Sequence, residues 1–293
     1  MRWRQGRRSE NVDDRRGARV PGGGMRLGLG GLVAVVLVGW LLGADPLTLL
    51  RVLGSGVETA QVPETLPDAG PEAAGTPGPG DELADFVSVV LADTEDTWGE
   101  LFAREGARYE PPRLVLFTDV VRSACGMGQS AMGPFYCPAD ARVYIDLGFY
   151  RDLRDRFRAP GDFAQAYVIA HEVGHHVQQL LGTTGELERL RAGRPEAEQN
   201  ALSVRLELQA DCYAGVWAHH AHRTRQLLEE GDVEEGLAAA SAIGDDRIQR
   251  ETRGTALPES FTHGTSQQRV AWFRRGLENG SLEVCDTFAS ARP

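Results

Sequence analysis

The sequence predicts an α+β protein that is mainly helical, has a small β-sheet and is preceded by one transmembrane helix. Several stretches after residue 80 repeat apolar residues at helical spacing, whereas only 113–117 and 141–147 have the pattern of short strands. Residues 27–43 are uncharged and almost wholly apolar. With 293 residues and 42% hydrophobic content, the chain is long enough for one large domain with appendages.

The N-terminal part predicts a membrane anchor. Residues 1–26 contain eight arginines and three acidic residues, a composition typical of a disordered basic tail. The apolar run within 27–53 is about 17 residues long, at the short limit for a membrane span. Arginines before the run place the N-terminus in the cytoplasm and the body outside, giving a single-pass cell-membrane protein. A cleaved signal peptide is the alternative, although no clear cleavage site is present.

Composition also separates a linker from the body. Residues 54–80 are rich in proline, glycine and acidic residues and contain no aromatic residue, so they predict a flexible linker. The folded domain is then expected over 81–287. The net charge of the whole chain is −11 although its start is basic, so the body is strongly acidic. This charge argues against nucleic acid as a partner.

Within the domain, helices predominate. An amphipathic helix is predicted over 81–102, and the turn-rich segment 125–137 lies between the two predicted strands. Further helices are predicted over 149–157, 163–181, 196–223, 233–243 and around 270–277. The polar stretch 185–198 is either a loop or an exposed helix.

The most informative motif is His-Glu-x-x-His, from His171 to His175. Residues four apart share a helical face, so these two histidines can bind one metal ion together. Glu172, beside the first histidine, is placed to take a proton from an attacking water molecule. The alternative without a metal site is a buried helix that carries two unrelated histidines.

A third ligand lies on the helix predicted over 196–223. Two histidines and Glu207 would form a catalytic zinc site with one open position. Asp211, four residues after Glu207, is placed to accept a hydrogen bond from the second ring nitrogen of a ligating histidine. The alternative is a solvated acidic face. The apolar neighbours of Glu207 disfavour it, because a carboxylate on a buried helix needs a partner.

These residues carry a resemblance to a known family. The pattern from His171 to Asp211 resembles that of the gluzincin metallopeptidases, and the wider sequence resembles the membrane-anchored bacterial neutral zinc metallopeptidase family. The matching segments are 137–140, 143–147, the His171 helix, 207–218 and 260–266, within roughly 86–285. The resemblance implies a zincin-like domain with the sheet beside the His171 helix, Zn²⁺ as cofactor and a peptide or protein as substrate.

The resemblance also suggests roles for two further elements. In metallopeptidases of this type an edge strand holds the substrate backbone by β-augmentation, which suggests this role for 141–147. An interior strand is the alternative. In gluzincins a histidine or tyrosine outside the metal ligands donates to the oxyanion, and we hypothesise that His263 does so here. A helix-capping or structural histidine is the alternative.

Four cysteines permit three pairings. Cys125 and Cys137 flank the turn-rich segment and are expected to be bonded in a protein outside the cytoplasm. This leaves Cys212 and Cys285, whose bond would tie the C-terminus to the Glu207 helix. Free buried thiols are the alternative.

The function predicted is that of a membrane-tethered zinc endopeptidase with Glu172 as general base. Two other classes stay open. One is a non-enzymatic, membrane-anchored zinc-binding scaffold, which would have no use for Glu172. The other is a zinc amidase that acts on cell-wall peptides, which the residue types at the metal do not distinguish from a peptidase.

Overall fold

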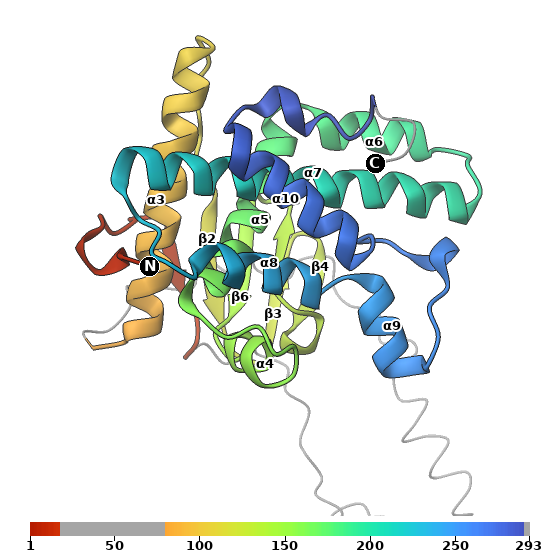
Figure 1. Ribbon diagram of the computed structural model, residues 1–293, viewed down its shortest axis with the longest axis horizontal. Helices are drawn as coiled ribbons and strands as arrows, with labels where there is room; N and C mark the ends of the chain where they lie inside the picture. Colours follow the sequence, from red (N-terminus) through yellow and green to blue (C-terminus); the bar gives the residue numbers. More distant parts are fainter. Residues whose placement is uncertain (18–79, 290–293) are drawn as a thin grey trace, which may run out of the picture. The chain divides into compact units, whose positions relative to one another are not determined.

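The computed structural model describes residues 1–17 and 80–289, which belong to one compact unit. Its helices lie over one face of a small sheet (Figure 1). The α-helices are α3 (Glu82–Arg104), α4 (Phe149–Asp155), α5 (Asp162–Leu180), α6 (Thr183–Arg191), α7 (Glu196–Arg225), α8 (Asp232–Ala242), α9 (Asp245–Arg253) and α10 (Ser266–Asn279). The strands are β1 (Val12–Asp14), β2 (Arg113–Phe117), β3 (Val120–Ser123), β4 (Gly126–Gln129), β5 (Phe135–Cys137) and β6 (Arg142–Asp146).

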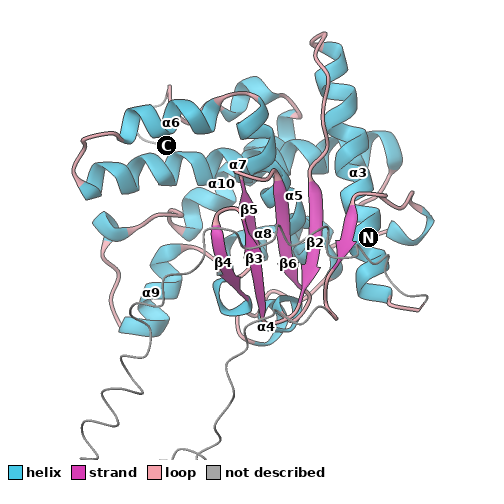
Figure 2. Cartoon of the chain, turned by 180° about the vertical axis from the view of Figure 1, so that it is seen from behind, coloured by secondary structure: helices cyan, strands magenta, loops and turns pink. Residues whose placement is uncertain are grey.

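The main sheet has the strand order β1-β2-β6-β5. β1, β2 and β6 are parallel to one another, and β5 is antiparallel to β6. β3 and β4 form a separate antiparallel pair. Figure 2 shows the strands side by side, with α5, α7 and α10 behind them. The mainly helical fold with a small sheet beside α5 agrees with the sequence prediction.

Helix α5 lies at the centre of the core, and most of its residues are buried. Its first turns bury Phe163, Tyr167 and Ile169 completely. Phe163 stacks on Trp217 of α7, and Tyr167 meets Phe273 of α10 edge to face. The His-Glu-x-x-His motif is therefore carried by a buried element.

The N-terminal segment differs from the disordered tail predicted for it. Residues 1–17 pack on the domain: β1 pairs with β2, and the buried Trp3 contacts Phe86 of α3 edge to face. Val12 is also buried in the main core. Arginines of this segment pair with acidic residues of α3, such as Arg8 with Asp85 at 2.6 Å and Arg7 with Asp96 at 2.8 Å. The positive charge therefore serves intramolecular ion pairs.

This packing overturns the predicted membrane topology. A cytoplasmic N-terminus and an extracytoplasmic domain would lie on opposite sides of a bilayer, yet β1 and β2 are neighbours in one sheet. Among the residues that the structure describes, no helix combines the length and the apolar character needed to span a membrane. The predicted anchor itself, 27–53, and the predicted linker up to residue 79 lie outside the described residues. The prediction of a single-pass membrane protein with this orientation is wrong.

Both predicted disulfides are present. Cys125 is bonded to Cys137 of β5, and Cys212 of α7 is bonded to Cys285. The second bond attaches the 3₁₀ helix η4 (Leu282–Cys285) to α7. It therefore fixes the C-terminal segment against the helix that carries Glu207.

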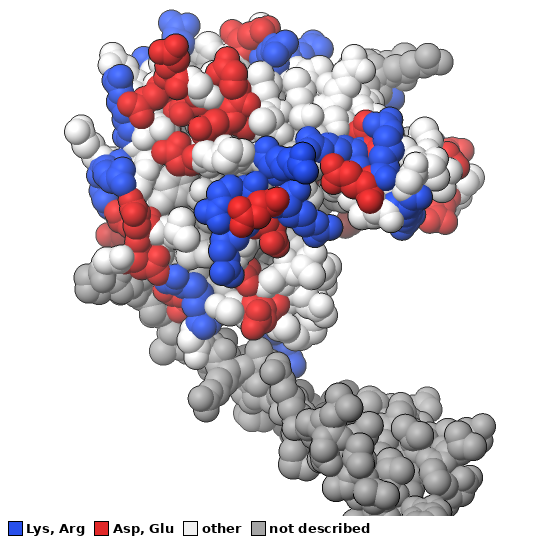
Figure 3. All heavy atoms as spheres, turned by 60° about the horizontal axis from the view of Figure 1, so that its bottom comes forward, with Lys and Arg blue, Asp and Glu red and all other residues white. Residues whose placement is uncertain are grey.

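Charged side chains of both signs lie next to one another on the face shown in Figure 3. On α9, for example, Arg247 pairs with Glu251 and Arg250 with Asp246, at a spacing of four residues. Such exposed pairs each contribute at most about 1 kcal/mol to stability. The fold therefore depends mainly on its apolar core and on the buried polar network described below.

Candidate active site

The site forms where α5 and α7 approach closely. A Cβ atom at Gly174 would lie 3.0 Å from the carbonyl oxygen of Ala210 and 3.2 Å from its Cα atom. Any side chain larger than hydrogen at position 174 would push the two helices apart. The glycine between the two histidines of the motif thus lets the face of α5 that carries them meet the face of α7 that carries Glu207.

Three predicted ligands come together at this contact. The Nε2 atom of His171 lies 3.2 Å from Oε2 of Glu207, and Nε2 of His175 lies 3.5 Å from Oε1. The three donor atoms all lie within 4.8 Å of one another. The two imidazole rings are nearly perpendicular, with centroids 4.8 Å apart.

These residues fit a zinc ion by chemistry and by spacing. Zinc prefers imidazole nitrogen and carboxylate oxygen at distances near 2.1 Å in a tetrahedral arrangement, so neighbouring donors are about 3.4 Å apart. The two nitrogen–oxygen distances at the site lie on either side of this value. Over residues 1–17 and 80–289, three protein ligands come together here, which leaves the fourth tetrahedral position open, as in catalytic rather than structural sites.

The electrostatics of the three groups also favour a cation. Burial alone lowers the pKa of His171, but the charge of Asp211 and hydrogen bonds to Asp211 and Glu207 raise this pKa to about 10. Burial raises the pKa of Glu207, but the charge of His175 and hydrogen bonds to both histidines bring it well below its ordinary value. A metal ion that binds here takes the place of ring protons, so its binding releases protons.

Asp211 lies beside His171. Its Oδ1 atom lies 2.9 Å from Nδ1 of His171 and accepts a short hydrogen bond from the Tyr167 hydroxyl. Arg269 of α10 donates to both carboxylate oxygens at 2.9 Å, and its side chain is 2% exposed. With Nδ1 facing the carboxylate, Nε2 of His171 is turned toward Glu207.

Arg269 was missed in the sequence because a single arginine on an amphipathic helix is typical of a solvated face. Two glycines bring α10 close enough for it to reach Asp211. A Cβ atom at Gly276 would lie 2.0 Å from the carbonyl oxygen of Cys212, and one at Gly215 would lie 2.1 Å from that of Phe273. The buried guanidinium neutralises a carboxylate that would otherwise be costly to bury.

Glu172 lines the same cavity as the three predicted ligands. The cavity has a volume of about 340 Å³, and its wall includes His171, Glu172, His175, Glu207 and His263. Glu172 itself is 7% exposed. The wall of one cavity therefore holds a further carboxylate together with the three-ligand cluster.

The edge strand at this cavity is β5. The strand predicted for substrate binding, 141–147, corresponds to β6, which lies inside the sheet between β2 and β5. That prediction is wrong, because the sequence did not reveal the short strand β5 that covers the edge of β6. β5 ends the strand order, and its residues Phe135 and Tyr136 line the cavity together with the turn before them.

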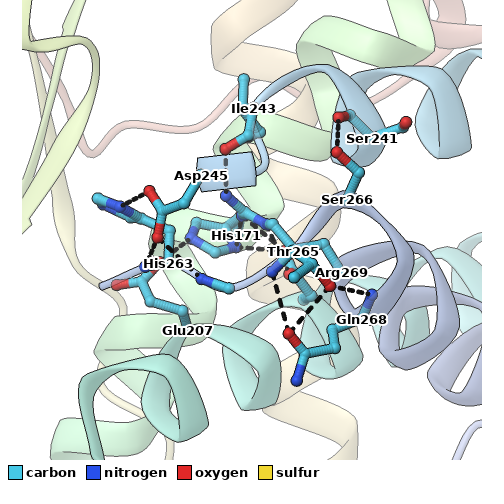
Figure 4. A network of polar contacts seen from close by, with 12 residues as sticks. His171, Glu207, Ser241, Ile243, Asp245, His263, Thr265, Ser266, Gln268 and Arg269 are labelled. Carbon is cyan, nitrogen blue, oxygen red and sulfur yellow. Dashed lines mark hydrogen bonds and ion pairs between the residues drawn. The ribbon is translucent and has the colours of Figure 1, made fainter. Parts of the chain in front are cut away.

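His263 lies at the cavity, as Figure 4 shows beside His171 and Glu207. Its Nδ1 atom is 3.2 Å from Oδ1 of Asp245. The Oδ2 atom of Asp245 accepts hydrogen bonds from the backbone N–H groups of residues 262, 263 and 264, which fixes the loop. The hydrogen bond with Asp245 raises the pKa of His263. Asp245 was not identified as a site residue from the sequence.

His176, next to His175, faces away from the metal ligands. Its Nε2 atom lies 2.7 Å from the carbonyl oxygen of Glu110, and its Nδ1 atom lies 3.0 Å from the Tyr136 hydroxyl. Burial lowers the pKa of this ring. It is a packing residue that connects α5 to β5 and to the segment before β2.

Comparison with models of known protein families shows the family to which the chain belongs. A family model described as "Putative neutral zinc metallopeptidase" matches residues 1–288. The chain belongs to this family. The match includes the N-terminal segment that completes the sheet and all the residues that converge at the site.

Sequence comparison finds relatives that are named as uncharacterised proteins. The uncharacterised protein YpfJ of Escherichia coli (strain K12) is 50% identical, and the match covers 99% of this chain and all of that protein. The uncharacterised protein Mb2605 of Mycobacterium bovis is 44% identical over 62% of this chain and 64% of its own length. No solved structure matched the chain.

Proposed function

We propose that the protein is a zinc-dependent endopeptidase. The observation that carries the proposal is the convergence of His171, His175 and Glu207 at one cavity whose wall also includes Glu172. The family points to the same chemistry. A structural zinc site is closed by four protein ligands and needs no carboxylate beside it.

The chain's own residues divide the chemistry among them. His171, His175 and Glu207 would hold zinc, which would supply the Lewis acidity needed to activate water and polarise the peptide carbonyl. Glu172 takes the proton of the attacking water and delivers it to the leaving amine. His263, held by Asp245, donates a hydrogen bond to the oxygen that becomes negatively charged.

The substrate is an extended peptide that pairs with β5. This strand is at the end of the sheet order and lines the cavity. Backbone pairing along an edge strand positions the scissile bond without regard to most side chains. The proposal thus moves the substrate-binding strand from β6 to β5.

Metal analysis of the full chain tests this function. We expect one zinc ion per chain, loss of peptide hydrolysis on chelation and recovery when zinc is added back. Glu207→Gln should weaken zinc binding by at least about 100-fold, because it removes a charged ligand rather than an outer partner. Glu198→Gln, exposed on the same helix, is the matched control and should bind zinc normally. A chain that binds no zinc refutes the proposal, and cleavage of cell-wall peptides alone would identify an amidase.

A second prediction concerns His263. The variant His263→Ala should retain its zinc and lose about 10²–10³-fold in kcat, the usual effect of removing one oxyanion donor. His222→Ala, on the exposed end of α7, should leave kcat unchanged. Steady-state kinetics with a peptide substrate and zinc analysis of both variants provide the measurement. Full activity of His263→Ala with normal folding would exclude the proposed role.

A further inference from the structure

The second metal histidine is supported differently from the first. Whereas Nδ1 of His171 faces the carboxylate of Asp211, Nδ1 of His175 lies 2.9 Å from Oε1 of Gln178. Gln178 is completely buried and lies one helical turn beyond His175 on α5. The partner of the Nδ1 atom of His175 is therefore a neutral amide rather than a charged group.

The direction of the hydrogen bonds around Gln178 is fixed by a backbone carbonyl. Its Nε2 atom lies 2.7 Å from the carbonyl oxygen of Leu206, which can only accept. The amide nitrogen must therefore face α7, and the amide oxygen must face His175. Because that oxygen can only accept, Nδ1 of His175 carries the proton. Its Nε2 atom then has a lone pair to offer on the side of Glu207.

A second glutamine extends this chain of hydrogen bonds. Nε2 of Gln178 also donates to Oε1 of Gln209 at 3.1 Å, and Nε2 of Gln209 donates to the carbonyl oxygen of Cys285 at 3.1 Å. Cys285 is bonded to Cys212 of α7. The amide nitrogen of each glutamine thus donates to a backbone carbonyl, and neither amide can turn over without losing a hydrogen bond between buried groups.

We propose that Gln178 is a positioning residue for zinc: its amide oxygen sets the tautomer and orientation of His175. The inference rests on the proposed function only in naming zinc as the ion. A purely structural role for Gln178, as a tie between α5 and α7, would stabilise the fold without a specific effect on the metal. The positioning role depends on the amide oxygen, which faces His175. The structural role depends on the amide nitrogen, which donates to Leu206 of α7.

Two substitutions at position 178 separate these roles. Gln178→Leu removes both ends of the amide at similar volume, whereas Gln178→Glu keeps an acceptor for His175 and loses the donor to Leu206. We expect Gln178→Leu to bind zinc about 10–100-fold more weakly than wild type. Gln178→Glu should recover most of this loss in zinc affinity, although it breaks the tie to α7. Gln179→Leu, exposed on the same helix, is the control.

The measurement is the zinc dissociation constant of the full chain, obtained by competition with a chromophoric chelator. Thermal unfolding of each metal-free variant is recorded beside it, so that a loss of fold is not mistaken for a loss of affinity. Wild-type affinity in Gln178→Leu, or equal losses in the leucine and glutamate variants, would overturn the inference. Failure of the wild-type chain to bind zinc would instead refute the proposed function.

Discussion

The Glu172→Gln variant is expected to bind one zinc ion per chain and to hydrolyse peptides about 10²–10⁴-fold more slowly than wild type. The amide has nearly the shape of the carboxylate, so the cavity and its three-ligand cluster should be preserved. It cannot accept the proton of the attacking water, however, and the leaving amine then lacks its proton donor. The loss should therefore appear in kcat with little change in KM.

Zinc content and steady-state kinetics of the purified variant are the two measurements. Glu188→Gln, an exposed position on α6, makes the same chemical change away from the cavity and should behave as wild type. A Glu172→Gln protein that cleaves peptides at the normal rate would disprove the general-base role. Loss of zinc together with activity would indicate that Glu172 holds the metal site rather than the proton.

The helices that carry the site were predictable because their signals are local. The periodicity that predicted a helix over 163–181 is realised in α5 (Asp162–Leu180), and that over 196–223 in α7 (Glu196–Arg225). The spacing of His171 and His175 required one face of one helix. That Glu207 would meet them was an inference from chemistry, and the close approach at Gly174 gives it a geometric reason.

The residues that escaped prediction depend on contacts between distant segments. Arg269 reaches Asp211 only because α10 packs closely on α7, which no local pattern reveals. Gln178 could have been found, since it lies three residues after His175 and so shares its helical face. β5 is three residues long and is recognisable as a strand only beside β6.

The packing of the N-terminal segment also depends on contacts with residues far away in the sequence. β1 is three residues long, and its partner β2 begins about a hundred residues later in the sequence. Read alone, the arginines before the apolar run have the pattern of a cytoplasmic flank. Their partners are acids of α3 that the sequence places beyond residue 80. A rule about membrane topology was therefore applied to residues that belong to the folded domain.

Deletion of residues 1–17 is accordingly expected to unfold the domain or nearly so. The deletion removes the buried side chains of Trp3 and Val12 and uncovers the edge of β2. Loss of one buried tryptophan side chain alone costs about 3–5 kcal/mol, and a domain has only about 5–15 kcal/mol in total. Urea unfolding of the shortened chain should show no cooperative transition, or one at a much lower midpoint. An equally stable chain that lacks residues 1–17 would contradict the expectation.

Two milder changes show whether the packing of residues 1–17 is the cause. Trp3→Ala should lower the free energy of unfolding by about 3–5 kcal/mol, whereas Arg2→Ala, whose side chain is 62% exposed, should change it by less than about 0.5 kcal/mol.

Replacing 18–79 by a flexible linker of about ten residues, which spans roughly 17 Å, should preserve stability. Arg16 and Asp81 form an ion pair, so the two ends of that excision lie close together. Because Asp162, at the start of α5, also contacts the Met1 backbone nitrogen, we expect zinc affinity to fall with stability when the segment is lost.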